Sequence, residues 1–195
     1  MKIDNKSIDV VLKALKAQLE KINKKIELVV CGGSALAAIG LVNRTTKDID
    51  VLGIVERNNG KLLIKKAVLP NWFEEAANKV ARDFNLPKDW INAGPTSLVD
   101  LGLPEGLENR LKMLSYGKNL TVHYISRLDQ IFLKLYAAVD RGGYHLQDLM
   151  KLKPSEEEIE KASRWSMTHD VSEGYRTVLK SLLRRLGFND VAKRI

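Results

Sequence analysis

The chain has 195 residues, of which 45% are hydrophobic and 29% are charged, with 32 Lys and Arg against 24 Asp and Glu. The apolar fraction is sufficient for a buried core and excludes intrinsic disorder, while the length fits one large domain or two small ones. The single Cys31 excludes a disulfide scaffold and points to a reducing compartment. No apolar run approaches the roughly 20 residues of a membrane helix, and the first residues carry no signal-peptide core. We therefore expect a soluble cytoplasmic protein without a membrane partner, whose net charge of +8 suits an anionic ligand such as a nucleotide or a nucleic acid.

Residues 1–126 mix helical and strand patterns. Apolar residues on one face predict a helix over 7–24, and a short β-branched run predicts a buried strand over 26–31. The same criteria predict a short helix over 35–39, strands over 48–55, 61–68 and 89–93, and a helix over 70–84. A long loop with one helical turn is expected over 94–109, followed by a hairpin of strands over 110–116 and 120–126.

Every segment after residue 126 has a helical pattern. We expect helices over 128–139, 144–152, 156–167 and 171–186. The sequence thus predicts an α/β (α+β) fold in two domains. A small mixed sheet flanked by helices fills 1–126, and a C-terminal helical bundle fills 127–195.

The densest group of polar residues follows the first predicted strand. A glycine pair between a strand and a helix, Gly32-Gly33, lets backbone N–H groups approach a phosphate, and Ser34 adds a hydroxyl donor. Asp48 and Asp50 are two residues apart on a strand and project from one face, which suits a hard ion such as Mg²⁺. Either feature alone is more often a turn or a solvated strand. Their combination favours a phosphate and metal site.

This pattern resembles the polymerase-β-type nucleotidyltransferase fold. The resemblance lies in residues 30–52, where a strand and Gly-Gly-Ser precede Asp-hydrophobic-Asp by roughly ten to fifteen residues. The stretch 128–152, with Lys134 and Asp148, resembles the helical half of bacterial and archaeal nucleotidyltransferase-like proteins, among them the AbiE-type abortive-infection toxins.

The resemblance implies attack of an acceptor on the α-phosphate of an NTP, with release of pyrophosphate. It makes Asp48 and Asp50 the Mg²⁺ ligands, places Lys134 on phosphate, and gives Asp148 the acidic position of the family's Lys…Asp segment. In toxin-like members the acceptor would be tRNA or protein, and a cognate antitoxin would be a partner. The predicted nucleotide-binding residues are Gly32, Gly33, Ser34, Arg44 and Thr46.

One departure from the family pattern leaves the activity open. Active members usually carry a third carboxylate on a later central strand, and the expected strand 120–126 offers Thr121 and His123 instead. Asp89 and Asp100 are weak substitutes. The alternative is a non-catalytic nucleotide- or RNA-binding module of the same fold. An aminoglycoside-type nucleotidylyltransferase ranks below both, because a cationic acceptor needs an acidic pocket and this chain is basic.

Several charged residues have a structural interpretation beside the functional one. Lys134 and Asp148 can equally form a buried ion pair that locks two helices, and a structural role is favoured for Asp140 and Arg141. His123 is expected to be structural. A solvated helix face is the default for four basic residues near the end of the chain, with an RNA-binding surface as the alternative. These residues are Arg176, Lys180, Arg184 and Arg185.

Overall fold

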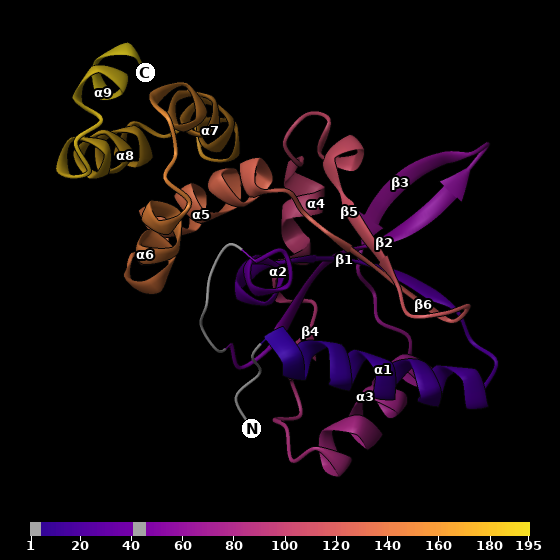
Figure 1. Cartoon of the computed structure of the whole chain (residues 1–195). Helices are drawn as coiled ribbons and strands as arrows, with labels where there is room; N and C mark the ends of the chain where they lie inside the picture. Colours follow the sequence, from indigo (N-terminus) through magenta and orange to yellow (C-terminus); the bar gives the residue numbers. More distant parts are fainter. Residues whose placement is uncertain (1–4, 41–45) are drawn as a thin grey trace. The chain divides into compact units, whose positions relative to one another are not determined.

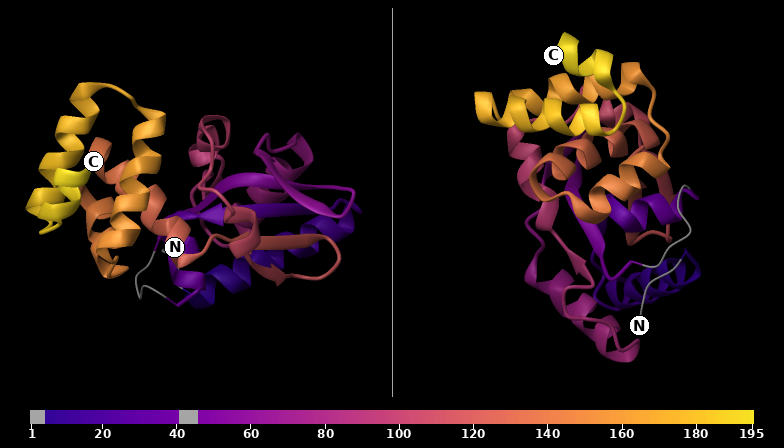
Figure 2. Two further views of the ribbon diagram at one scale, coloured as in Figure 1. Left: turned by 90° about the horizontal axis from the view of Figure 1, so that it is seen from above. Right: turned by 90° about the vertical axis from the view of Figure 1, so that its left-hand side faces the viewer.

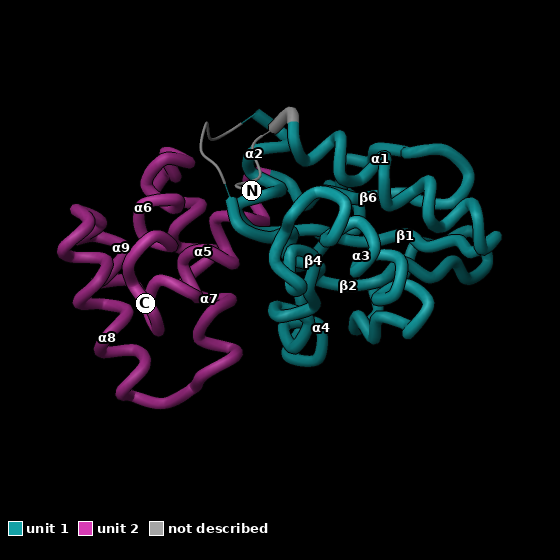
Figure 3. Tube along the Cα trace, turned by 90° about the horizontal axis from the view of Figure 1, so that it is seen from below, with its two compact units in different colours: residues 1–126 teal, residues 127–195 magenta. Residues whose placement is uncertain are grey.

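The computed structural model of the chain describes residues 5–40 and 46–195 (Figure 1). The chain divides into two compact units, residues 1–126 and 127–195, coloured separately in Figure 3. The first unit contains the sheet and the second contains only helices. The predicted α+β class is therefore confirmed. None of the described helices is long and apolar enough to span a membrane.

In the described part of the chain the sheet is mixed and has the strand order β3-β2-β1-β6-β5, with β4 attached to β2. Strand β1 lies at the centre, antiparallel to β2 and parallel to β6. The hairpin partners β3 and β5 are antiparallel to β2 and β6, whereas β4 is parallel to β2. The strands are β1 (Ile26–Cys31), β2 (Ile49–Asn58), β3 (Lys61–Lys66), β4 (Ile91–Asn92), β5 (Lys112–Ser115) and β6 (Leu120–Tyr124).

Helices α1 (Asn5–Lys21) and α3 (Asn71–Asp83) pack against each other on one side of the sheet. Each has an apolar stripe at helical spacing, and the members of these stripes are buried. In α3 the stripe consists of Phe73, Ala76, Ala77, Val80 and Ala81. Both helices were predicted from this pattern. Burial of these stripes stabilises the first unit.

Two helix boundaries differ from the predicted ones by three residues. Helix α1 ends at Lys21, three residues early, because Asn23 adopts a left-handed conformation with φ 50° and the Lys24 N–H bonds to the Leu19 carbonyl. Helix α2 (Gly32–Ala38) begins directly at the glycine pair, where a loop was expected to precede it.

The predicted loop over 94–109 contains short helical turns. They are η1 (Gly94–Thr96), α4 (Ser97–Leu101) and η2 (Leu107–Arg110). The Thr96 hydroxyl accepts a bond from the Ala67 N–H at 2.6 Å, and Lys66 pairs with Asp100. These contacts fasten the segment to the end of β3. Such short turns carry too few residues for a periodic signal, which is why the sequence predicted a long loop with only one helical turn here.

A charged cluster crosses three strands of the sheet. Glu27 of β1 accepts two bonds from Arg57 of β2, at 3.2 and 2.9 Å, and lies 2.9 Å from Nε2 of His123 on β6. His123 is buried, which agrees with the structural role that we expect for it. The bonds from Arg57, more than those from His123, hold the pKa of Glu27 below its ordinary value.

This cluster predicts a stability change at acid pH. Because the folded-state pKa of Glu27 lies below its ordinary 4.5, the stabilisation is complete above pH 4.5 and is lost as the pH falls through the folded-state value. We expect Glu27→Gln to lower the free energy of unfolding by about 1 kcal/mol at pH 7 and by much less at pH 3.5. Urea denaturation of both proteins at the two pH values measures this. The same difference at both pH values would contradict the prediction.

The second unit is a bundle of helices, seen from two further sides in Figure 2. Arg127 links separate segments of this bundle, because its guanidinium pairs with Glu158 at 2.6 Å and donates to the Leu152 carbonyl at 2.9 Å. Ser155 and Glu158 form a reciprocal capping box at the start of α7. Its helices are α5 (Arg127–Arg141), α6 (Gly143–Lys151), α7 (Glu156–His169), α8 (Glu173–Arg185) and α9 (Asn189–Arg194), the last of which was not predicted.

Candidate functional site

The Gly-Gly-Ser and Asp-x-Asp motifs meet where β1 ends and β2 begins. Strand β1 ends at Cys31, whose register partner on the antiparallel strand β2 is Asp50. Since α2 starts at the next residue, Gly32, the first glycine of the pair lies directly beside the strand that carries Asp50. Sequence positions 18 residues apart are thereby joined at one end of the sheet.

Gly32 is needed at this junction for two reasons. Its φ of +72° lies in the left-handed region that favours glycine. A Cβ atom at this position would also run into the Asp50 carboxylate. The backbone of Gly32 and the Asp50 side chain therefore lie against each other, which ties the glycine pair to the aspartate more closely than the sequence spacing could show.

Asp48 is the residue just before β2, and its neighbour Thr46 orients it. The Thr46 hydroxyl lies 3.2 Å from the Asp48 carbonyl oxygen and 3.3 Å from its Oδ1, and donates toward both. Asp48 and Asp50 are both half-buried and flank Ile49, whose side chain is buried in the core. Because successive side chains alternate along an extended chain, we expect both carboxylates on the face opposite Ile49.

The other predicted nucleotide-binding residues are placed as follows. Gly33 and Ser34 lie in α2 and are buried. The Ser34 hydroxyl donates to the Cys31 carbonyl at 3.4 Å, so in this structure it supports the turn from strand to helix. Arg44 lies outside the described residues. The nucleotide-binding roles of these residues stay predictions.

The strand beside Asp50 is not the one on which the family resemblance leads us to expect a third carboxylate. That strand, predicted over 120–126, forms β6, which pairs with β1 and is not a neighbour of β2 in the sheet. The neighbour of β2 here is the two-residue strand β4, and the register partner of Asp50 on it is Asn92. Sequence reasoning missed Asn92, although the short strand predicted over 89–93 contained it. Two residues of pairing leave no pattern that singles out one side chain.

The donor set at this end of the sheet fits a magnesium ion. Mg²⁺ prefers oxygen ligands and retains several waters, so it is often held by one or two carboxylates together with substrate phosphates. Asp48 and Asp50 supply the carboxylates, and Asn92 adds an amide oxygen on the adjacent strand. Among the described residues no group of three His, Cys, Asp or Glu side chains could hold a metal. The site therefore departs from a three-carboxylate cage.

A protein-family model described as "Nucleotidyltransferase of unknown function (DUF6036)" matches residues 8–149. The chain belongs to this family. No curated protein and no solved structure matches the chain significantly. The DUF6036 match confirms the nucleotidyltransferase assignment made from the motifs. It covers the Gly-Gly-Ser and Asp-x-Asp motifs and extends into α6, so that it includes Lys134 and Asp148.

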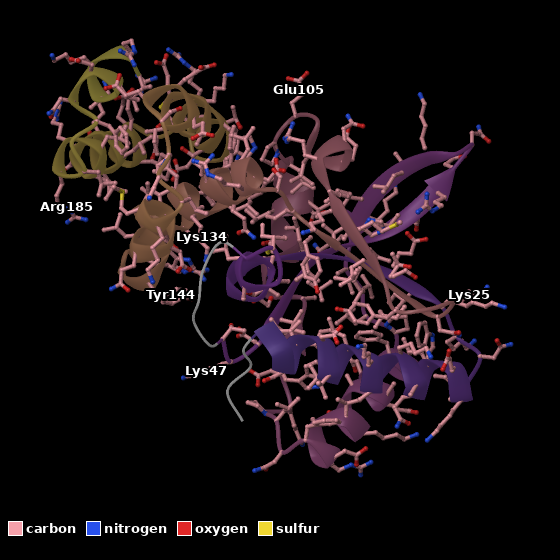
Figure 4. The ribbon with its side chains drawn as sticks, viewed as in Figure 1. Lys25, Lys47, Glu105, Lys134, Tyr144 and Arg185 are labelled. Carbon is pink, nitrogen blue, oxygen red and sulfur yellow. The ribbon has the colours of Figure 1, made fainter. Side chains whose placement is uncertain are left out.

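In this DUF6036 protein Lys134 and Asp148 form a buried ion pair within the helical unit. Lys134 Nζ on α5 lies 2.9 Å from Asp148 Oδ2 on α6, and both side chains are at most 5% exposed. The same Nζ lies 5.8 Å from the centre of the Tyr144 ring, within the range of a cation–π contact (Figure 4). The pair thus links two helices across the break at Gly142. In contrast, Asp140 and Arg141 pair at 3.2 Å on the surface, each 72% exposed.

Proposed function

We propose that this protein transfers a nucleotidyl group from an NTP to a macromolecular acceptor, tRNA or protein, in a Mg²⁺-dependent reaction. The observation that carries the proposal is the junction of Gly32 with Asp50, because it places a glycine turn and two carboxylates at one end of the sheet. The membership in a nucleotidyltransferase family supports the same reaction class.

Each residue of the site has a distinct role in this proposal. Asp48 and Asp50 hold the metal ion, which when bound neutralises charge that develops on the phosphate oxygens. Gly32, Gly33 and Ser34, with Arg44 and Thr46, bind the nucleotide. Thr46 also keeps the Asp48 carboxylate oriented through its hydroxyl. The acceptor attacks the α-phosphate in line, and pyrophosphate leaves.

The family resemblance also assigns roles to Lys134 and Asp148. In this proposal Lys134 contacts phosphate, and Asp148 holds the acidic position of the same segment. The resemblance to AbiE-type toxins supports the further proposal that the protein is the toxin of a toxin–antitoxin pair with a cognate antitoxin. An RNA acceptor is supported by exposed basic side chains on α8. Among the described residues, Arg184 and Arg185 form no ion pair, whereas Arg176 pairs with Glu173.

A second candidate function is a non-catalytic nucleotide- or RNA-binding module. The observation that favours it is Asn92, a neutral residue where the neighbouring strand faces Asp50. Such a module would bind NTP or RNA without releasing pyrophosphate.

The experiment that separates the two functions uses the full chain with each of the four α-³²P-labelled NTPs, total RNA, cell protein and Mg²⁺. Nucleotidyl transfer predicts label in a product that ribonuclease or protease removes, together with pyrophosphate release that EDTA abolishes. The nature of the digesting enzyme identifies the acceptor class. Calorimetric binding of NTP without label transfer or pyrophosphate would overturn the enzymatic proposal in favour of the binding module.

A further inference from the structure

The residue beside Asp50 on the neighbouring strand is an asparagine, and its chemistry has consequences for the metal site. We infer that Asn92 supplies the third oxygen donor to the ion held by Asp48 and Asp50, and that its lack of charge limits the site to one divalent ion in the absence of nucleotide. This inference rests on the proposed function, since it takes the two aspartates as metal ligands.

The register of β4 places the Asn92 side chain on the face of Asp50. In the parallel pair, Ile49 is opposite Ile91 and Asp50 is opposite Asn92. Both isoleucines are buried, with exposed fractions of 1% and 6%, and therefore face the core. Because successive side chains alternate, the next residue of each strand projects to the opposite, half-buried face. Asp50 and Asn92 are thus side-by-side neighbours on strands about 4.8 Å apart.

The Asn92 amide is held in place by its own turn. Its Oδ1 accepts the Gly94 N–H at 2.8 Å, and its Nδ2 lies 3.3 Å from the Asp89 carbonyl. The turn is anchored in the core, because the carbonyl of the buried Trp90 accepts the Ile49 N–H at 2.6 Å. An amide oxygen has two lone pairs, so that one is available after the bond from Gly94. Amide oxygens of asparagine are Mg²⁺ ligands in protein kinases.

The charge at position 92 decides how many ions the site can hold. Asp48 and Asp50 together carry two negative charges, which balance one divalent ion. Two-metal sites hold their ions about 3.5–4 Å apart, where two divalent ions repel each other strongly. A carboxylate at position 92 would supply a third negative charge, and the described residues offer no other side chain that completes a three-acid group. In the protein without nucleotide, Asn92 therefore completes the ligand set of one ion without adding negative charge that would help to hold a second.

The test measures Mn²⁺ binding to the full chain without nucleotide, by the electron paramagnetic resonance signal of free Mn²⁺. The wild-type protein should bind one ion, Asn92→Asp should bind its first ion at least about tenfold more tightly, and Asn92→Ala should bind several-fold more weakly. Asn58→Asp is the matched control, because it adds the same charge at the exposed far end of β2. It should leave the affinity unchanged. Thermal unfolding verifies that each variant is folded.

Two results would overturn the inference in distinguishable ways. If Asn92→Asp and Asn92→Ala bind Mn²⁺ like the wild type while Asp48→Asn/Asp50→Asn abolishes binding, Asn92 only closes its turn and the proposed function stands. If the double aspartate variant binds Mn²⁺ as well as the wild type, the metal site itself is wrong and both proposals fail. Two ions bound to the wild type would overturn the one-ion limit.

Discussion

Replacing Asp50 by asparagine should lower the rate of nucleotidyl transfer by about a thousandfold, equivalent to about 4 kcal/mol of transition-state stabilisation. The substitution is nearly isosteric, so the contact with Gly32 and the pairing with Cys31 remain possible while one charge is lost. The loss should therefore appear in catalysis and metal affinity rather than in folding. Label transfer from the accepted NTP measures the rate, and thermal unfolding measures the stability.

The matched control for this prediction is Glu56→Gln. Glu56 is an exposed carboxylate on the same strand, six residues further along β2, and its substitution removes the same charge from the same element. We expect it to retain the wild-type rate. Unimpaired transfer by Asp50→Asn combined with Asp48→Asn would contradict the assignment of these residues as metal ligands.

The largest expected effect on stability comes from breaking the buried pair of Lys134 and Asp148. Lys134→Met removes the buried cation that pairs with Asp148, and breaking a buried ion pair by removing one partner costs about 3–5 kcal/mol. Denaturant unfolding should show this loss in the helical unit. The double variant Lys134→Met/Asp148→Ala removes both charges and should recover at least half of it, since replacing both partners by apolar groups is often close to neutral.

The exposed pair of Asp140 and Arg141 provides the control for these variants of the buried pair. It lies at the end of the same helix, and its removal in Asp140→Ala/Arg141→Ala should change the free energy of unfolding by no more than about 0.5 kcal/mol. The double variant of the buried pair also separates two roles. A folded protein that has lost transfer activity would show that Lys134 acts on phosphate, whereas a folded and active one would show that the pair only locks α5 to α6.

Most of the fold was accessible from local patterns. The stripe on α3 buries one face of the helix, and the continuous apolar run of β1 is buried at five of its six residues, so both local patterns reflect the packing directly. The patterns failed where an element is too short to show a period. Helix α9 and the turns within 94–110 have at most six residues each, and their formation depends on contacts such as the bond between Ala67 and Thr96.

The candidate site was predictable only in part, for a related reason. The composition and spacing of Gly32, Asp48 and Asp50 indicated a phosphate and metal site, because these residue types have few other uses in that combination. The identity of the third neighbour depended on strand order. A sheet in which β6 lies beside β1 and β4 lies beside β2 places Asn92 at Asp50, and no local pattern determines which strands become neighbours.

The sequence by itself determined that this protein is an α+β nucleotidyltransferase-family chain with two carboxylates two residues apart, since both features are encoded by residues close together. Only the tertiary structure decided which residues lie beside Asp50 and beside Lys134. Pairing between β2 and β4, and between α5 and α6, joins positions 42 and 14 residues apart, Asp50 with Asn92 and Lys134 with Asp148. Such pairings depend on how whole faces of helices and strands pack against one another, and no single segment of the sequence determines that packing.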